Sequence, residues 1–132
     1  MTSANSLTGA IIDYIRMQHC HAERVNNYSR TVKDKYGNDR YIPSAGFKGT
    51  ADIHACKIFQ VILTARKTDI STAFGIGEGW KKYGLFVAIE VKIGRDKLSE
   101  AQEYYRECVQ KAGGVYMVVH TWDEFIEKWN EI

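Results

Sequence analysis

The chain has 132 residues, of which 45% are hydrophobic and 26% charged, and its formal net charge is +2. This length and composition indicate a single globular domain over residues 1–132 and exclude a disordered or collagen-like chain. No apolar stretch approaches the roughly 20 residues that span a bilayer, and the first residues do not resemble a secretory signal. The three cysteines lack paired spacing. We therefore expect a reduced, cytoplasmic location and no membrane partner.

Charge is unevenly distributed along the chain. Residues 1–97 contain 15 Lys and Arg against 9 Asp and Glu, whereas residues 98–132 contain 3 against 7. A basic body with an acidic end is compatible with a surface that faces nucleic acid. A solvated pair of acidic helices at the C-terminus explains the same distribution.

Hydrophobic periodicity predicts seven elements in chain order. They are a helix over 6–18, strands over 21–30, 51–58 and 85–93, a helix from 99 to 112, a strand over 115–119 and a helix from 122. Capping boxes at Ser99–Gln102 and Thr121–Glu124 begin the last two helices, and Gly113 and Gly114 end the first of these. A turn is predicted at 36–39, where Gly and Asn accept positive φ. The order α-β-β-β-α-β-α predicts an α/β fold with helices flanking a sheet.

Residues 59–83 form an insertion whose pattern does not decide its structure. Residues 59–64 either extend a strand or begin a new one, and the segment with Gly75, Gly77 and Gly79 is expected to be a loop. Trp80-Lys81-Lys82-Tyr83 mixes aromatic and basic side chains, as segments that contact single strands do. A solvated loop with one anchored tryptophan is an equal alternative.

Glu90 and Lys92 lie in a strand that otherwise has the composition of a buried one. Strand alternation puts both on the face of Phe86 and Ala88. Burying a polar group without a partner costs about 2–7 kcal/mol, so these charges need an explanation. This face of the strand is exposed to solvent, or the two residues form ion pairs with each other or with Asp52. The third alternative is that they belong to a functional site.

Asp52 favours the functional site. It begins a second predicted strand, and two carboxylates from neighbouring strands provide the hard oxygen ligands that Mg²⁺ prefers. The backbone carbonyl of Val91 can supply a third oxygen. Lys92, on the face of Glu90, can orient a water or stabilise developing negative charge.

Four motifs occur in a fixed order: G-T-A-D (49–52), A-I-E-V-K (88–92), L-S-E-A-Q (98–102) and A-G-G-V (112–115). Together they resemble the PD-(D/E)XK nucleases, and most closely their virus-type replication-repair nuclease (VRR-NUC) branch. R-V-N-N (24–27) resembles the first strand of that branch. The resemblance covers nearly the whole chain apart from 59–83.

The resemblance implies a restriction-endonuclease-like mixed central sheet flanked by helices, and phosphodiester hydrolysis that depends on Mg²⁺ or Mn²⁺. It makes Asp52 and Glu90 metal ligands, Lys92 the catalytic lysine and Gln102 a catalytic residue from the following helix. Gln102 is also the N3 residue of the capping box, and both roles are compatible.

Two positions depart from the family pattern. Ala51 replaces a proline that shapes the turn before the first acid. The first helix has no acid at 4–7 to contribute to the metal site, so Asn5 or a water has to take that place. This departure motivates an alternative function without turnover.

Several residues are expected to contact nucleic acid: Arg24, Asn26, Asn27, Lys48 and His54. Arg30, Lys33 and Lys35 can follow phosphates along the first hairpin, and such contacts give salt-dependent binding. An ordinary polar hairpin and a core histidine with an internal partner are the alternatives.

These observations predict a divalent-metal-dependent DNA nuclease, acting on junctions, flaps or other branched DNA in replication or repair. The resemblance suggests a bacterial or phage protein, and a branched substrate favours a homodimer. The alternatives are a catalytically weak or inactive nucleic-acid-binding module of the same fold, and a protein-interaction domain.

Overall fold

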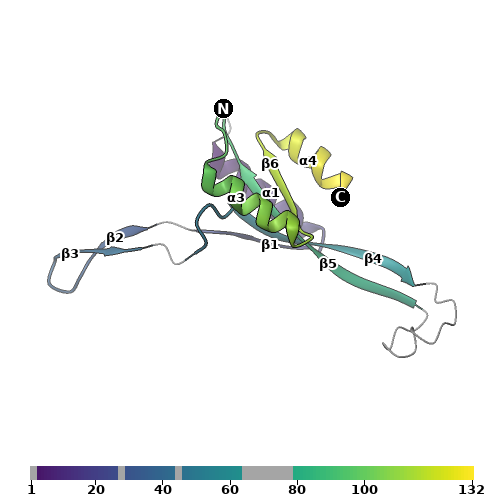
Figure 1. The fold of residues 1–132 in the computed structure, drawn as a ribbon, viewed down its shortest axis with the longest axis horizontal. Helices are drawn as coiled ribbons and strands as arrows, with labels where there is room; N and C mark the ends of the chain where they lie inside the picture. The colour runs from purple at the N-terminus through teal and green to yellow at the C-terminus, as the bar shows by residue number, and fades with distance from the viewer. Residues whose placement is uncertain (1–2, 27–28, 44–45, 64–78) are drawn as a thin grey trace.

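The computed structural model describes residues 3–26, 29–43, 46–63 and 79–132 (Figure 1). Its elements in chain order are α1 (Ala4–Met17), β1 (His21–Arg24), β2 (Arg30–Lys33), β3 (Asp39–Ile42), β4 (Ile53–Leu63), β5 (Gly79–Val91), α3 (Glu100–Lys111), β6 (Val115–Val119) and α4 (Trp122–Glu131). Four strands form the central sheet in the order β1-β4-β5-β6. β4 pairs antiparallel with β1 and β5, whereas β5 and β6 are parallel. The predicted mixed α/β fold is confirmed.

The predicted strand over 21–30 is wrong, because this segment contributes to two separate sheets. β1 ends at Arg24, and the Val25 N–H then donates to the Asp52 carbonyl at 2.8 Å. β2 pairs only with β3, in a two-stranded ribbon. The chain therefore has two more strands before α3 than the predicted order.

β4 and β5 form a long hairpin, and its strands include the first and the last residues of the predicted insertion at 59–83. All 11 residues of β4 pair with β5, from Ile53 opposite Ile89 to Leu63 opposite Gly79. Residues 59–63 therefore extend a strand, which is one of the two predicted possibilities. The loop predicted around Gly75 and Gly77 lies outside the described residues, while Gly79 begins β5.

The two faces of the sheet have different cores. α1 and α4 cover one face, where the largest fully buried side chains include Ile11, Ile89, Phe125 and Trp129. α3 covers the other face with a smaller cluster of Ala51, Ala88, Val109 and Tyr116. The predicted alternation is confirmed from Val87 to Val91, since Val87, Ile89 and Val91 join the first cluster and Ala88 the second. The predicted end of this strand at residue 93 is wrong, because β5 ends at Val91 and Ile93 is exposed.

The capping box predicted at Thr121–Glu124 is incomplete: Oγ1 of Thr121 accepts the Glu124 N–H, but the Glu124 carboxylate accepts the N–H of His120 and not that of Thr121. In α3 the buried residue is Val109, whereas Ala112, where the predicted helix ends, is exposed. Ala112 follows the last helical residue, whereas Val109 lies one turn earlier against the sheet. Among the described residues, no helix is long and apolar enough to cross a bilayer.

Candidate active site

Asp52 and Glu90 lie side by side where β4 begins and β5 ends. Ile53 pairs with Ile89, so the antiparallel register puts Asp52 opposite Glu90. The Val91 N–H donates to Oδ2 of Asp52 at 2.9 Å, which fixes the aspartate against the end of β5. We call Asp52 and Glu90 the acid pair.

Glu90 is buried, with 3% of its surface exposed. Burial raises the pKa of its carboxyl, and the Asp52 carboxylate raises this pKa further, while Lys92 and Gln102 oppose the shift. Oε1 of Glu90 lies 3.0 Å from Nζ of Lys92 and 2.6 Å from Nε2 of Gln102. Oε2 is buried and has no hydrogen-bond partner in the described part of the chain. Glu90 thus has one occupied and one available oxygen.

Gln102 connects the helix cap to the charged residues. Its backbone N–H donates to Oγ of Ser99 at 3.3 Å, and its Oε1 accepts from the Ser99 N–H at 2.9 Å, so the predicted capping box is confirmed. The same Oε1 accepts from Nζ of Lys92 at 3.0 Å. One side chain therefore caps α3 and holds both Lys92 and Glu90.

Gly49 has no side chain, so the backbone before Asp52 packs closely against the first turn of α3. Its φ is +83°, and a Cβ at this position would lie 2.2 Å from the Ala101 carbonyl oxygen. Next to it, the ring of Phe47 packs on Tyr104 and Tyr105, with centroids 6.0 and 5.6 Å away. This contact sets the position of α3, and thus of Gln102, over the acid pair.

A second row of residues lies on the same face of the sheet, two positions along the strands from the acid pair. His54 and Tyr116 both pair with Ala88, from opposite sides of β5. The Tyr105 hydroxyl lies 2.8 Å from Nε2 of His54. Burial lowers the pKa of His54, and Glu23 opposes that shift. His54 was predicted to contact nucleic acid, but here this nitrogen has an internal partner.

Tyr116 is the residue that sequence reasoning missed. Its hydroxyl is buried without a partner in the described part of the chain. Burial raises its pKa, and the negative charges of Glu90 and Asp52 raise it further, which indicates that the hydroxyl is near the acid pair. The alternation of V-Y-M-V-V marks Tyr116 as facing α3, but the sequence does not show which β5 residue lies beside it.

Of the other predicted contact residues, Arg24 lies opposite Ile53 at the start of β4. Arg24 is exposed and donates from Nη2 to Oδ1 of Asn5 at 2.6 Å. Asn5, considered as a replacement for the missing acid, is therefore bound to an arginine. Asn26 and Lys48 are exposed, and Asn27 lies outside the described residues.

The acid pair fits the donor set of a divalent metal. Oε2 of Glu90 and the Asp52 carboxylate provide oxygen ligands of the kind that Mg²⁺ prefers, with water completing its coordination. The N–H of Val91 points to the β4 edge, and in a strand the carbonyl of the same residue points to the same edge. In the described ranges, no group of three or more His, Cys, Asp or Glu could hold a metal. Any site here therefore depends on two carboxylates.

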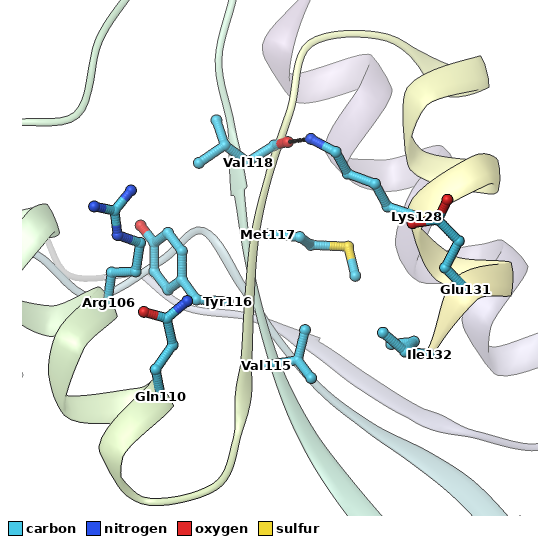
Figure 2. Close-up of a pocket in the computed structure, with 9 residues that line it drawn as sticks. All are labelled: Arg106, Gln110, Val115, Tyr116, Met117, Val118, Lys128, Glu131 and Ile132. Carbon is cyan, nitrogen blue, oxygen red and sulfur yellow. Dashed lines mark hydrogen bonds between the residues drawn. The ribbon is translucent and has the colours of Figure 1, made fainter.

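A separate pocket of about 540 Å³ lies at the open edge of β6. Figure 2 shows Arg106, Gln110 and Tyr116 on its α3 side, and Lys128 and Ile132 on its α4 side. Its lining contains neither member of the acid pair, nor Lys92 or Gln102. The pocket therefore borders the candidate active site only through Tyr116.

Comparisons with models of protein families, with curated proteins and with solved structures found no match to this chain. The resemblance to VRR-NUC domains therefore remains a prediction that rests on the motifs.

Proposed function

We propose that the chain is a divalent-metal-dependent DNA nuclease with Asp52, Glu90 and Lys92 at its active site. The observation that carries the proposal is their convergence on the α3 face of the sheet. The two acids come from strands that approach the site in opposite directions, and Lys92 follows the second strand. A fold without a charged ligand has little reason to bury Glu90 with one oxygen unpartnered.

Each residue has a role that its contacts support. Asp52 and Glu90 would hold Mg²⁺ or Mn²⁺, which supplies Lewis-acid chemistry at a phosphodiester. The side chain of Lys92 is only 13% exposed, and its ammonium can stabilise the negative charge that develops on the phosphoryl oxygens. Gln102 positions Lys92 and Glu90 relative to each other. The proposed preference for branched DNA and the proposed homodimer rest on the family resemblance.

Cleavage of labelled DNA tests this proposal. Single-strand, duplex, flap and four-way-junction substrates are incubated with Mg²⁺, with Mn²⁺ or with EDTA. We expect cleavage only with metal, and a loss of at least about 100-fold in Asp52→Asn and in Lys92→Ala. Asp13→Asn and Lys111→Ala are matched controls, because both residues are exposed on helices and lie outside the site. Cleavage that persists in both site variants would rule out the assignment.

A nucleic-acid-binding module without turnover is the second candidate. It is favoured by the absence, among the described residues, of a third metal-binding side chain beside the acid pair. Metal-independent DNA binding with no cleavage in either metal would support this candidate over the nuclease.

A further inference from the structure

The β2–β3 ribbon, here called the arm (residues 30–42), stands away from the central sheet (Figure 1). Its two strands are four residues each and pair only with one another. An isolated two-stranded hairpin is marginally stable in water. The packing of the domain core therefore does not explain why the chain builds this ribbon.

The two faces of the arm differ in charge. Arg30 pairs with Ile42 and Val32 with Arg40, so these four residues share one face, the arginine face. The opposite face, here called the paired face, carries Thr31, Lys33, Asp39 and Tyr41.

The charges of the paired face and the turn have local partners. Nζ of Lys33 lies 2.9 Å from Oδ1 of Asp39. Asp34 accepts the N–H groups of Tyr36 and Asn38 at 2.8 and 2.9 Å, and Lys35 lies 4.9 Å from the centre of the Tyr36 ring. Lys33 and Asp39 form an ion pair, and the adjacent Asp34 and Lys35 carry opposite charges, so the net positive charge of the arm comes from the arginine face.

Arg30 and Arg40 present that charge side by side. Both are exposed, and the register makes them diagonal neighbours, whose Cβ atoms are typically about 7–8 Å apart. None of the four paired residues on this face is acidic, and the carboxylate of Asp34, the next acid along the chain, accepts N–H groups of the turn. Guanidinium groups bind phosphate through paired N–H donors, so two of them on an exposed ribbon fit a phosphate backbone.

The arm is joined to the chain beside the candidate active site. It lies in the connection between β1 and β4, which are paired neighbours with Arg24 opposite Ile53. The Val25 N–H before the arm donates to the Asp52 carbonyl at 2.8 Å. Gly49 after the arm packs on the first turn of α3. The segments that lead into and out of the arm therefore lie beside the acid pair, so a polymer bound by the arm is held on a ribbon that extends from the site.

We propose that the arginine face of the arm binds the phosphate backbone of duplex DNA next to the cleavage site. This inference rests on the proposed function for its choice of polyanion. A two-stranded ribbon fits the major groove of B-form DNA, which is about 12 Å wide, but not the deep, narrow major groove of duplex RNA. Arginines that contact phosphates bind without reading sequence.

Binding without metal tests the arm independently of catalysis. Anisotropy of a labelled DNA duplex of about 20 base pairs, two helical turns, is measured in EDTA at several salt concentrations. We expect the Arg30→Ala/Arg40→Ala variant to bind about tenfold more weakly at low salt, and its log–log salt slope to fall by about 2. Arg30→Lys/Arg40→Lys keeps both charges and should keep most of the slope.

Two controls separate the arginine face from general effects of charge and folding. Lys33→Ala/Asp39→Ala changes the paired face of the same ribbon and leaves net charge unchanged, so affinity should stay within about twofold of wild type. Lys111→Ala removes an exposed positive charge at the far end of α3 and should leave the salt slope unchanged. The circular dichroism of all variants should match that of the wild type.

The outcomes distinguish this inference from the nuclease proposal. If Arg30→Ala/Arg40→Ala binds DNA with the same affinity and salt slope as the wild type, the proposal that the arm binds DNA is wrong. The nuclease proposal is then still judged by the cleavage assay. If DNA binding depends on Arg30 and Arg40 but no DNA is cleaved in either metal, the role of the arm is supported and the nuclease proposal is wrong. Equal wild-type affinity for duplex RNA of the same length would overturn the proposed fit to the DNA groove.

Discussion

Nε2 of Gln102 lies 2.6 Å from Oε1 of Glu90, while Oε1 of the same amide lies 3.0 Å from Nζ of Lys92. The amide thus donates to the acid and accepts from the lysine, which only one of its two orientations allows. Because Gln102 lies in the first turn of α3, the helix and the end of β5 are joined through the charged residues of the candidate site.

Gln102→Ala should reduce DNA cleavage by about 10–100-fold, because residues that orient ligands and catalytic groups have effects of this size. Ser99→Ala is the matched control. It removes the cap of α3, at a cost of about 1 kcal/mol in stability, but keeps the contacts of Gln102 with Glu90 and Lys92. If Ser99→Ala loses as much activity as Gln102→Ala, the amide acts only through the helix.

Asp52→Asn should stabilise the metal-free protein by about 0.5–1 kcal/mol near neutral pH. The two carboxylates repel each other, and an asparagine oxygen can still accept the Val91 N–H. Mg²⁺ should raise the melting temperature of the wild type, with about 1.4 kcal/mol of stabilisation at ten times its dissociation constant, but not that of Asp52→Asn. Thermal unfolding with and without Mg²⁺ measures both effects, and an equal Mg²⁺ response in the two proteins would exclude the acid pair as the metal site.

The sequence predicted the shared face of Glu90 and Lys92 and the capping box of α3, because both depend on local spacing. Alternation puts Glu90 and Lys92 on one face, and Ser99 and Gln102 have the spacing of a cap. Their meeting with Asp52 needs only that the two strands pair antiparallel.

The turn of the β2–β3 ribbon was predicted at 36–39, where Gly37 has a positive φ, but its two strands were not, for a physical reason. No residue of R-T-V-K or D-R-Y-I is fully buried, so neither strand shows the alternation that burial imposes. The position of Tyr116 beside Ala88 follows from the parallel register of β5 and β6, which depends on contacts between distant segments. Local sequence patterns therefore predict neither the strands β2 and β3 nor the register that puts Tyr116 beside Ala88.

Gly49→Ala should lower the free energy of unfolding by about 2 kcal/mol or more. A methyl group would clash with the backbone of Ala101, and the positive φ of 83° disfavours any side chain. Gly37→Ala is the matched control, since its φ is also +83° but no atom lies within 4 Å of the added Cβ. Denaturant unfolding measures both variants, and equal losses would show that backbone strain acts alone, without the contact to α3.

Glu124→Gln should destabilise the protein near neutral pH by about 1 kcal/mol. Burial opposes the ionisation of Glu124, but its bonds with Lys128 and His120 outweigh burial and hold its pKa below the usual 4.5. An acid with a lowered folded pKa contributes stability above its unfolded pKa and loses it as pH falls through the folded pKa. The difference from wild type should therefore shrink in acid.

Glu127→Gln is the control for this pH dependence, because Glu127 is exposed on the same helix. Unfolding of both variants and the wild type is followed across the acidic range. A wild-type advantage over Glu124→Gln that stays constant with pH would contradict a role for the ionised carboxylate.

Tyr116→Phe and Tyr105→Phe should change stability in opposite directions, although both remove a hydroxyl from the layer between α3 and the sheet. The Tyr116 hydroxyl is buried without a partner, so its removal should stabilise the protein by about 1 kcal/mol. The Tyr105 hydroxyl lies 2.8 Å from Nε2 of His54, and its removal should cost about 1 kcal/mol. Denaturant unfolding of the metal-free protein measures both changes. A loss of stability in Tyr116→Phe would mean that this hydroxyl has a partner in solution, and a water shared with Oε2 of Glu90 would then account for both unpartnered atoms.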